Sequence, residues 1–141
     1  MDKFLQTVKE HEGFSSSVMQ DSLGYWTIGF GCCVDKRKNC GLTEEQASYI
    51  LNSQLSDAEL ELSHLPWFLL LDIVRQDVLI ELCFNIGLDG VLEFKQMIAS
   101  IENKDYAAAS MHLLNSLWAK QVKAGRADNM ASRLKDGIYA S

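Results

Sequence analysis

Three side chains near the N-terminus carry groups that could act together on one bond. Glu12, Asp21 and Thr27 are separated by eight and by five residues, which places two carboxyl groups and a hydroxyl in one short stretch. Cleavage of a glycosidic bond needs two carboxyl functions. A protonated one donates to the leaving oxygen, and an ionised one handles water or the positive sugar ring. Glycosidic cleavage is therefore one hypothesis for these residues, provided that the local elements bring the three groups together.

The elements expected around these residues are a helix and a hairpin. Apolar residues recur at helical spacing before Gly13, which can end that helix in the left-handed conformation, so Glu12 is expected at a helix end. From 14 to 31 the helical period gives way to alternation, with the sequence DSLG as a turn. We therefore expect a short hairpin with Asp21 in its turn and Thr27 on its second strand.

The rest of the chain predicts helices. Thr43 and Gln46 can form a capping box at the start of a helix whose apolar stripe continues to Leu62. The segment 67–87 is apolar on nearly all sides, which is typical of a helix buried in the middle of a domain. Shorter helices are expected at 93–104, 105–118 and 126–137.

The composition indicates one compact domain and argues against several classes of protein. With 141 residues, of which 48% are apolar, the chain can bury a core of its own. Its formal net charge of −6 argues against nucleic-acid binding, because phosphate contacts depend on clustered Lys and Arg. Charged residues interrupt the first thirteen positions. We therefore expect no signal peptide or membrane anchor, and a chain that starts in the cytoplasm.

The four cysteines are expected to be reduced thiols, since no export signal is predicted. Cys32, Cys33 and Cys40 lack the two-pair spacing of a structural zinc site and a fourth ligand nearby, so we predict no metal. Cys83 lies within the apolar segment and should act as a small buried hydrophobe. Trp118 is expected to pack in the helical core.

Several segments together resemble a known family. They are EGF at 12–14, DSLGYWTIGFG at 21–31, LTEEQA at 42–47, FNIGLDGVLEF at 84–94, and Trp118 followed by Gln121, Arg126 and Gly137. In this order they resemble the phage lysozymes of the T-even type, glycoside hydrolase family 24, also called endolysins. The resemblance runs over almost the whole chain.

The resemblance implies an α+β fold of the lysozyme type. A small N-terminal β-hairpin lobe, at about 13–60, would be joined by a long buried helix to a mainly α-helical C-terminal lobe. That helical lobe would comprise about 66–141 together with the N-terminal helix. The whole chain, 1–141, would form a single catalytic domain.

The implied activity is that of a muramidase that hydrolyses the β-1,4 bond between N-acetylmuramic acid and N-acetylglucosamine in peptidoglycan, with inversion. By resemblance Glu12 is the general acid, and Asp21 and Thr27 hold the attacking water. Arg126 matches a family arginine that approaches the acid from the helical lobe. The residues expected to bind substrate are Phe84, Asn85, His112 and Arg126. No cofactor is expected.

The resemblance also implies a biological setting. We expect a monomer, made in the cytoplasm of a host bacterium, that acts on the wall in the periplasm after release through a holin or a similar pore. Packaging in a virion is another route to the wall. Two alternatives stay open: a catalytically inactive peptidoglycan-binding or regulatory module, and transglycosylation in the same cleft.

Overall fold

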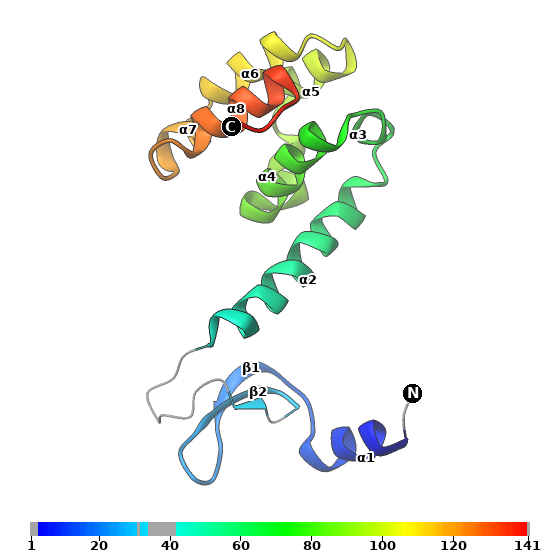
Figure 1. Cartoon of the computed structure of the whole chain (residues 1–141), viewed down its shortest axis with the longest axis vertical. Coiled ribbons are helices and arrows are strands. Elements are labelled where there is room, and N and C mark those ends of the chain that lie inside the picture. The colour runs from blue at the N-terminus through cyan, green and yellow to red at the C-terminus, as the bar shows by residue number, and fades with distance from the viewer. Residues whose placement is uncertain (1–2, 31, 34–41, 141) are drawn as a thin grey trace. The chain divides into compact units, whose positions relative to one another are not determined.

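The computed structural model describes residues 3–30, 32–33 and 42–140 (Figure 1). The chain divides into two compact units, Met1–Leu51 and Asn52–Ser141. Helices predominate, and strands occur in the first unit among the described residues. The expected α+β class is confirmed. The predicted lobe boundaries stay a prediction.

The first unit begins with a helix and a small antiparallel sheet. Helix α1 (Lys3–Glu12) ends at Gly13, whose φ of +70° is the left-handed conformation that glycine adopts without strain. The sheet has the order β1-β2-β3. Its strands are β1 (Ser15–Gln20), β2 (Trp26–Gly29) and β3 (Cys32–Cys33). The predicted hairpin is confirmed, and it is extended by the short third strand.

Helix α2 (Glu44–Leu62) begins at the predicted capping box. The Thr43 backbone N–H donates to Gln46 Oε1 at 3.0 Å, and the Gln46 N–H donates to Thr43 Oγ1 at 3.2 Å. Only the second half of the predicted apolar stripe is buried, at Ala58 and Leu62. The chain passes from the first unit into the second within α2. This helix is mostly exposed. The apolar segment 67–87 belongs wholly to the second unit and is only partly buried, because Leu69, Leu70 and Ile73 face solvent.

That apolar segment forms two helices rather than the single one predicted. Helix α3 (Pro66–Leu69) is one turn long, and α4 (Ile73–Leu92) starts after a break in which Asp72 caps the new helix. The Asp72 carboxylate accepts the Arg75 backbone N–H at 3.0 Å. Within α4, Gly87 leaves the helical conformation at φ +78° and produces a kink.

The predicted segment 105–118 is likewise interrupted. Ser116 caps a new helix by accepting the Ala119 N–H at 3.1 Å. The helices of this part of the chain are α5 (Lys95–Glu102), α6 (Tyr106–Leu114), α7 (Leu117–Gln121) and α8 (Arg126–Asp136).

The core of the second unit lies among these helices. Helix α6 packs against α5 and α8, and α8 also packs against α4 (Figure 1). The largest fully buried side chains are Phe68, Leu62, Leu79, Leu82, Met97, Leu113, Met130, Leu134, Val78 and Val91. Within the described residues, no helix has the length and continuous apolarity to cross a lipid bilayer.

Candidate active site

Glu12 is the last residue of α1. The Gly13 backbone N–H still bonds to the Lys9 carbonyl at 3.0 Å, and the left-handed Gly13 then turns the chain toward β1. The side chain of Glu12 is exposed. The predicted placement at a helix end is confirmed, and it presents this carboxyl group beside the start of the sheet.

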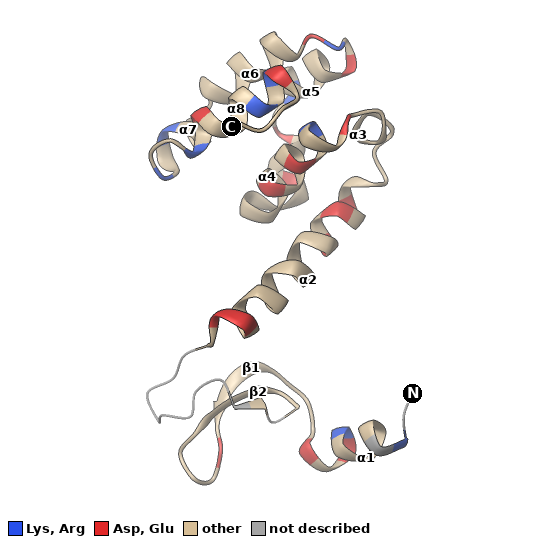
Figure 2. Ribbon diagram, in the orientation of Figure 1, with Lys and Arg blue, Asp and Glu red and all other residues tan. Residues whose placement is uncertain are grey.

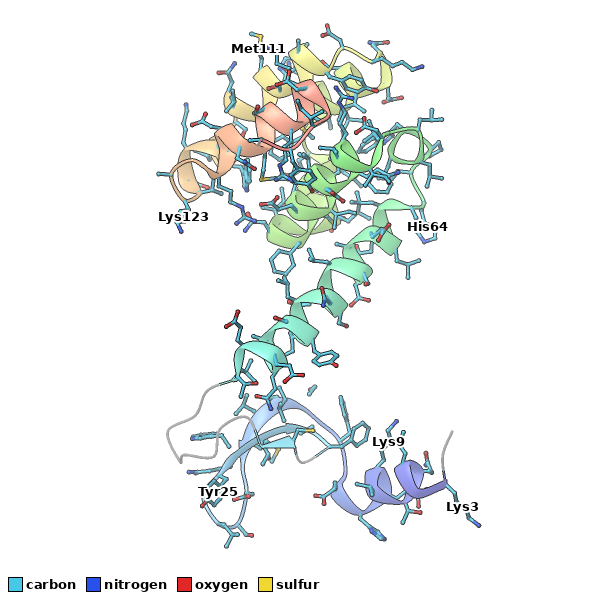
Figure 3. The ribbon with its side chains drawn as sticks, in the orientation of Figure 1. Lys3, Lys9, Tyr25, His64, Met111 and Lys123 are labelled. Atoms are coloured by element: carbon cyan, nitrogen blue, oxygen red, sulfur yellow. The ribbon has the colours of Figure 1, made fainter. Side chains whose placement is uncertain are left out.

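Asp21 occupies the turn between β1 and β2, as predicted. Its Oδ1 accepts two backbone N–H groups, from Leu23 at 2.9 Å and from Tyr25 at 2.8 Å. The Asp21 backbone N–H also bonds to the Tyr25 carbonyl at 2.8 Å, and Gly24 N–H bonds to the Asp21 carbonyl at 3.0 Å. Figure 3 labels Tyr25 at this end of the hairpin. One carboxylate oxygen is thus fixed by the turn, and the residue is exposed.

Thr27 lies on β2, half-buried, opposite Met19 of β1. Its hydroxyl donates to the Met19 carbonyl at 3.3 Å. Because the proton points to that carbonyl, the lone pairs of Oγ1 can accept a hydrogen bond from water. The strand pairing therefore fixes both the position and the polarity of this hydroxyl.

These three groups all belong to the first unit. Acid catalysis with a positioned water requires a proton donor, a fixed carboxylate and a group that orients the water. Glu12, Asp21 and Thr27 are of the types that can supply these three functions. The residues predicted to bind substrate all belong to the second unit, and each is described there.

Phe84 and Asn85 lie on α4 just before its kink. Phe84 is exposed and lines a surface pocket between α2 and α4. That pocket is formed by Gln54, Asp57, Ala58, Glu61, Cys83 and Phe84. Asn85 is exposed, and its Oδ1 accepts the Trp118 Nε1–H at 2.8 Å. Asn85 therefore has a structural partner that the sequence did not reveal.

His112 lies near the C-terminal end of α6, and Arg126 lies at the N-terminal end of α8. His112 is half-buried in the last turn of α6, and Arg126 is the first residue of α8. Arg126 Nε donates to Glu81 Oε1 at 3.3 Å. Glu81 is a residue that sequence reasoning missed.

Glu81 holds a second arginine with its other oxygen. Arg133 Nη2 donates to Glu81 Oε2, and Arg133 Nε donates to Asn129 Oδ1 at 3.0 Å. Arg126 and Arg133 are seven residues apart, which places them on one face of α8. Figure 2 marks acidic positions on α4 and basic positions on α8. The spacing of the arginines places them on one face, but it does not identify their acidic partner.

Two cysteines, Cys32 and Cys83, are free thiols in the part of the chain that the structure describes. Cys83 is buried, as predicted, and burial together with the charge of Glu61 raises the pKa of its thiol. Cys32 is exposed on β3, and Cys40 lies outside the described residues. Among the residues that the structure describes, no group of three or more His, Cys, Asp or Glu could hold a metal ion.

The sequence of this chain is similar to those of known proteins. Residues 9–135 match the family model described as Phage lysozyme. The chain is 25% identical, over 157 aligned positions, to the Probable T4-type lysozyme 1 of Dictyostelium discoideum, with 92% of each chain covered. It is 26% identical, over 162 positions, to the Pre-baseplate central spike protein Gp5 of Enterobacteria phage T4. That match covers 96% of this chain and 28% of the phage protein.

Proposed function

Because the chain belongs to the phage lysozyme family, we propose that it is a peptidoglycan muramidase. It hydrolyses the β-1,4 bond between N-acetylmuramic acid and N-acetylglucosamine, with inversion at the anomeric carbon. The family match covers the helix end, the hairpin and the start of α8, so all seven proposed site residues fall inside it.

The observation that carries the proposal is the anchoring of Asp21. Two backbone N–H groups hold its Oδ1, so the carboxylate keeps one position, and within the described residues its second oxygen takes no part in this anchoring. Such a fixed anion suits the stabilisation of a positive sugar ring and the orientation of water. A carboxylate free to rotate would serve neither role well.

Each residue then has a defined task. Glu12 donates a proton to the leaving oxygen, and Asp21 and Thr27 hold the attacking water on the opposite face of the sugar. Attack on that face inverts the anomeric carbon, and the reaction needs no cofactor. In this proposal the substrate is contacted by Phe84, Asn85, His112 and Arg126.

The biological setting is an endolysin for host cell lysis. The enzyme acts as a monomer that accumulates in the host cytoplasm and reaches the wall in the periplasm through a holin or a similar pore. The similarity to the central spike protein Gp5 supports a second setting, a virion-borne enzyme that opens the wall during entry. Detection of the chain in purified virions distinguishes the two settings.

Analysis of the cleavage products tests the reaction itself. Purified peptidoglycan is digested, and the reducing end and its anomeric configuration are read by NMR before mutarotation. We expect N-acetylmuramic acid at the reducing end in the α configuration. A β product means retention, a 1,6-anhydro product means transglycosylation, and N-acetylglucosamine at the reducing end means another bond. Binding to the wall without any cleavage would identify an inactive module.

A further inference from the structure

A network of two ion pairs connects α4 with α8 in the second unit. Glu81 of α4 bonds to two arginines of α8, with Oε1 to Arg126 and Oε2 to Arg133. The sequence singled out Arg126 but predicted neither of these ion pairs. The three side chains differ in burial: that of Arg133 is buried, whereas those of Glu81 and Arg126 are partly exposed.

Arg133 is the buried arginine of this network, and several contacts hold it in place. Its side chain is only 7% exposed, Asn129 accepts its Nε–H, and its guanidinium lies over the ring of Tyr139 at 5.2 Å. A buried arginine that is bonded on several sides cannot move far without losing all of these contacts. Glu81 is therefore held in place through Oε2.

Arg126 is the more exposed of the two arginines. Its side chain is 30% exposed, and its Nε is occupied by Glu81 at 3.3 Å. A guanidinium has five N–H donors, of which four are on the Nη groups. No hydrogen bond to these Nη groups occurs within the part of the chain that the structure describes. With one carboxylate shared between two cations, the cluster keeps a net positive charge of about one, and this charge is open to solvent at Arg126.

We propose that Glu81 is a positioning residue that fixes Arg126 so that its Nη edge meets a carboxylate. This inference rests on the proposed function, in which Arg126 belongs to the substrate-binding residues. The planar edge of a guanidinium matches a carboxylate in two parallel hydrogen bonds, and fixing Nε removes most of the rotational freedom that such a pair would otherwise lose. The carboxylate comes either from the wall or from the enzyme itself.

A double-mutant cycle tests whether Glu81 acts through Arg126. Glu81→Gln, Arg126→Gln and the double variant are assayed on soluble wall glycan, and kcat and KM are measured separately. We expect each single variant to lose about tenfold in kcat/KM, the size of one charge-assisted hydrogen bond. The double variant should match Arg126→Gln within about twofold, because the second change then removes nothing further.

Thermal unfolding separates this role from a merely structural one. Glu81→Gln also removes the charged partner of the buried Arg133, so Tm should fall in both backgrounds. Asp89→Asn removes one exposed carboxylate from the same helix and should leave kcat/KM unchanged. If Glu81→Gln costs as much activity without Arg126 as with it, the positioning role is wrong.

The source of the carboxylate is read from a second substrate, wall glycan whose carboxyl groups have been amidated. A carboxylate of the wall predicts a KM effect of Arg126→Gln that disappears on this substrate. A carboxylate of the enzyme predicts a kcat effect that is equal on both substrates. An Arg126→Gln variant that loses nothing on either substrate would overturn the inference while the wild-type activity stands. An inactive wild-type protein would instead overturn the proposed function, and the inference with it.

Discussion

The indole of Trp118 donates its Nε1–H to the side-chain oxygen of Asn85 at 2.8 Å, which joins α7 to the end of the straight part of α4. Trp118 is buried, and Asn85 supplies the acceptor for its indole N–H. The carbonyl of Asn85 is therefore part of the fold, and any contact of Asn85 with substrate uses a side chain that is already held in place.

Asn85→Leu should lower the free energy of unfolding by about 1–3 kcal/mol, because the indole N–H is left buried without an acceptor. Urea unfolding followed by tryptophan fluorescence measures the loss. In a Trp118→Phe background the same change should cost much less, since no donor is left unsatisfied. An equal cost in both backgrounds would mean that packing of Asn85, and not this hydrogen bond, is responsible.

Gly137 ends α8 at φ +69°, and a Cβ there would lie 2.7 Å from Arg75 Nη1. Arg75 cannot move away easily, because its Nε and Nη2 donate to the carbonyls of Leu134 and Lys135, each at 2.7 Å. Gly137→Ala should therefore cost more than the roughly 1 kcal/mol of a left-handed alanine. Differential scanning calorimetry gives the change in Tm.

Gly125→Ala is the matched control for this prediction. Gly125 also has a positive φ, +84°, but a Cβ at this position would meet nothing within 4 Å, so only the backbone strain applies. The difference between the two variants isolates the contact with Arg75. Equal losses of stability would show that the Arg75 side chain moves aside freely.

Asp72 predicts a dependence of stability on pH. Burial opposes its ionisation, but the hydrogen bonds from the Arg75 side chain and backbone and the charge of Arg75 outweigh it and hold the pKa of Asp72 below its ordinary value. A lowered pKa in the folded state stabilises the protein above the unfolded pKa, and this contribution is lost as the pH falls through the folded pKa.

Asp72→Asn retains an oxygen that can cap α4 and removes the charge. Because the carboxylate is partly exposed, we expect a loss below about 1 kcal/mol at neutral pH. This loss should shrink as the pH falls below about 4, where the carboxyl of the unfolded chain takes up a proton, and it should vanish below the lower pKa of the folded state. Urea unfolding at several pH values measures it, and a loss that stays constant down to low pH would exclude the ion pair as its cause.

Structural features that depend on residues close along the chain could be predicted from the sequence. The reciprocal bonds of Thr43 and Gln46, the left-handed Gly13 and the turn at Asp21 all depend on neighbours close along the chain. The break at Asp72 was missed because apolar residues continue on both sides of it, so the hydrophobic pattern shows no interruption.

Contacts between distant parts of the chain were not readable. Glu81 lies 45 residues from Arg126 and 52 from Arg133, and nothing in the local pattern selects one acidic residue of α4 over another. The Trp118 to Asn85 bond spans 33 residues and was hidden in the same way. The side chains of the proposed catalytic residues could be assigned to their elements, since each element has its own local signal.

Glu12→Gln should abolish the clearing of purified peptidoglycan, with a loss of at least about a hundredfold, because the amide cannot donate a proton to the leaving oxygen. The side chain is exposed, so the fold should be unchanged by circular dichroism and Tm. Glu10→Gln changes an exposed carboxylate on the same helix and should retain full activity. Persistence of most of the activity in Glu12→Gln would refute the assignment of the general acid.

Asp21→Asn separates the structural task of this residue from its chemical one. The amide oxygen can still accept the N–H groups of Leu23 and Tyr25, so the turn should persist and Tm should change little. The negative charge is lost, and with it the stabilisation of the sugar cation, so we expect kcat to fall by about a hundredfold or more. Asp21→Ala removes both functions and should lower Tm as well as kcat. If Asp21→Asn keeps wild-type kcat while Asp21→Ala loses it, Asp21 serves only to hold the turn, and another group must stabilise the cation.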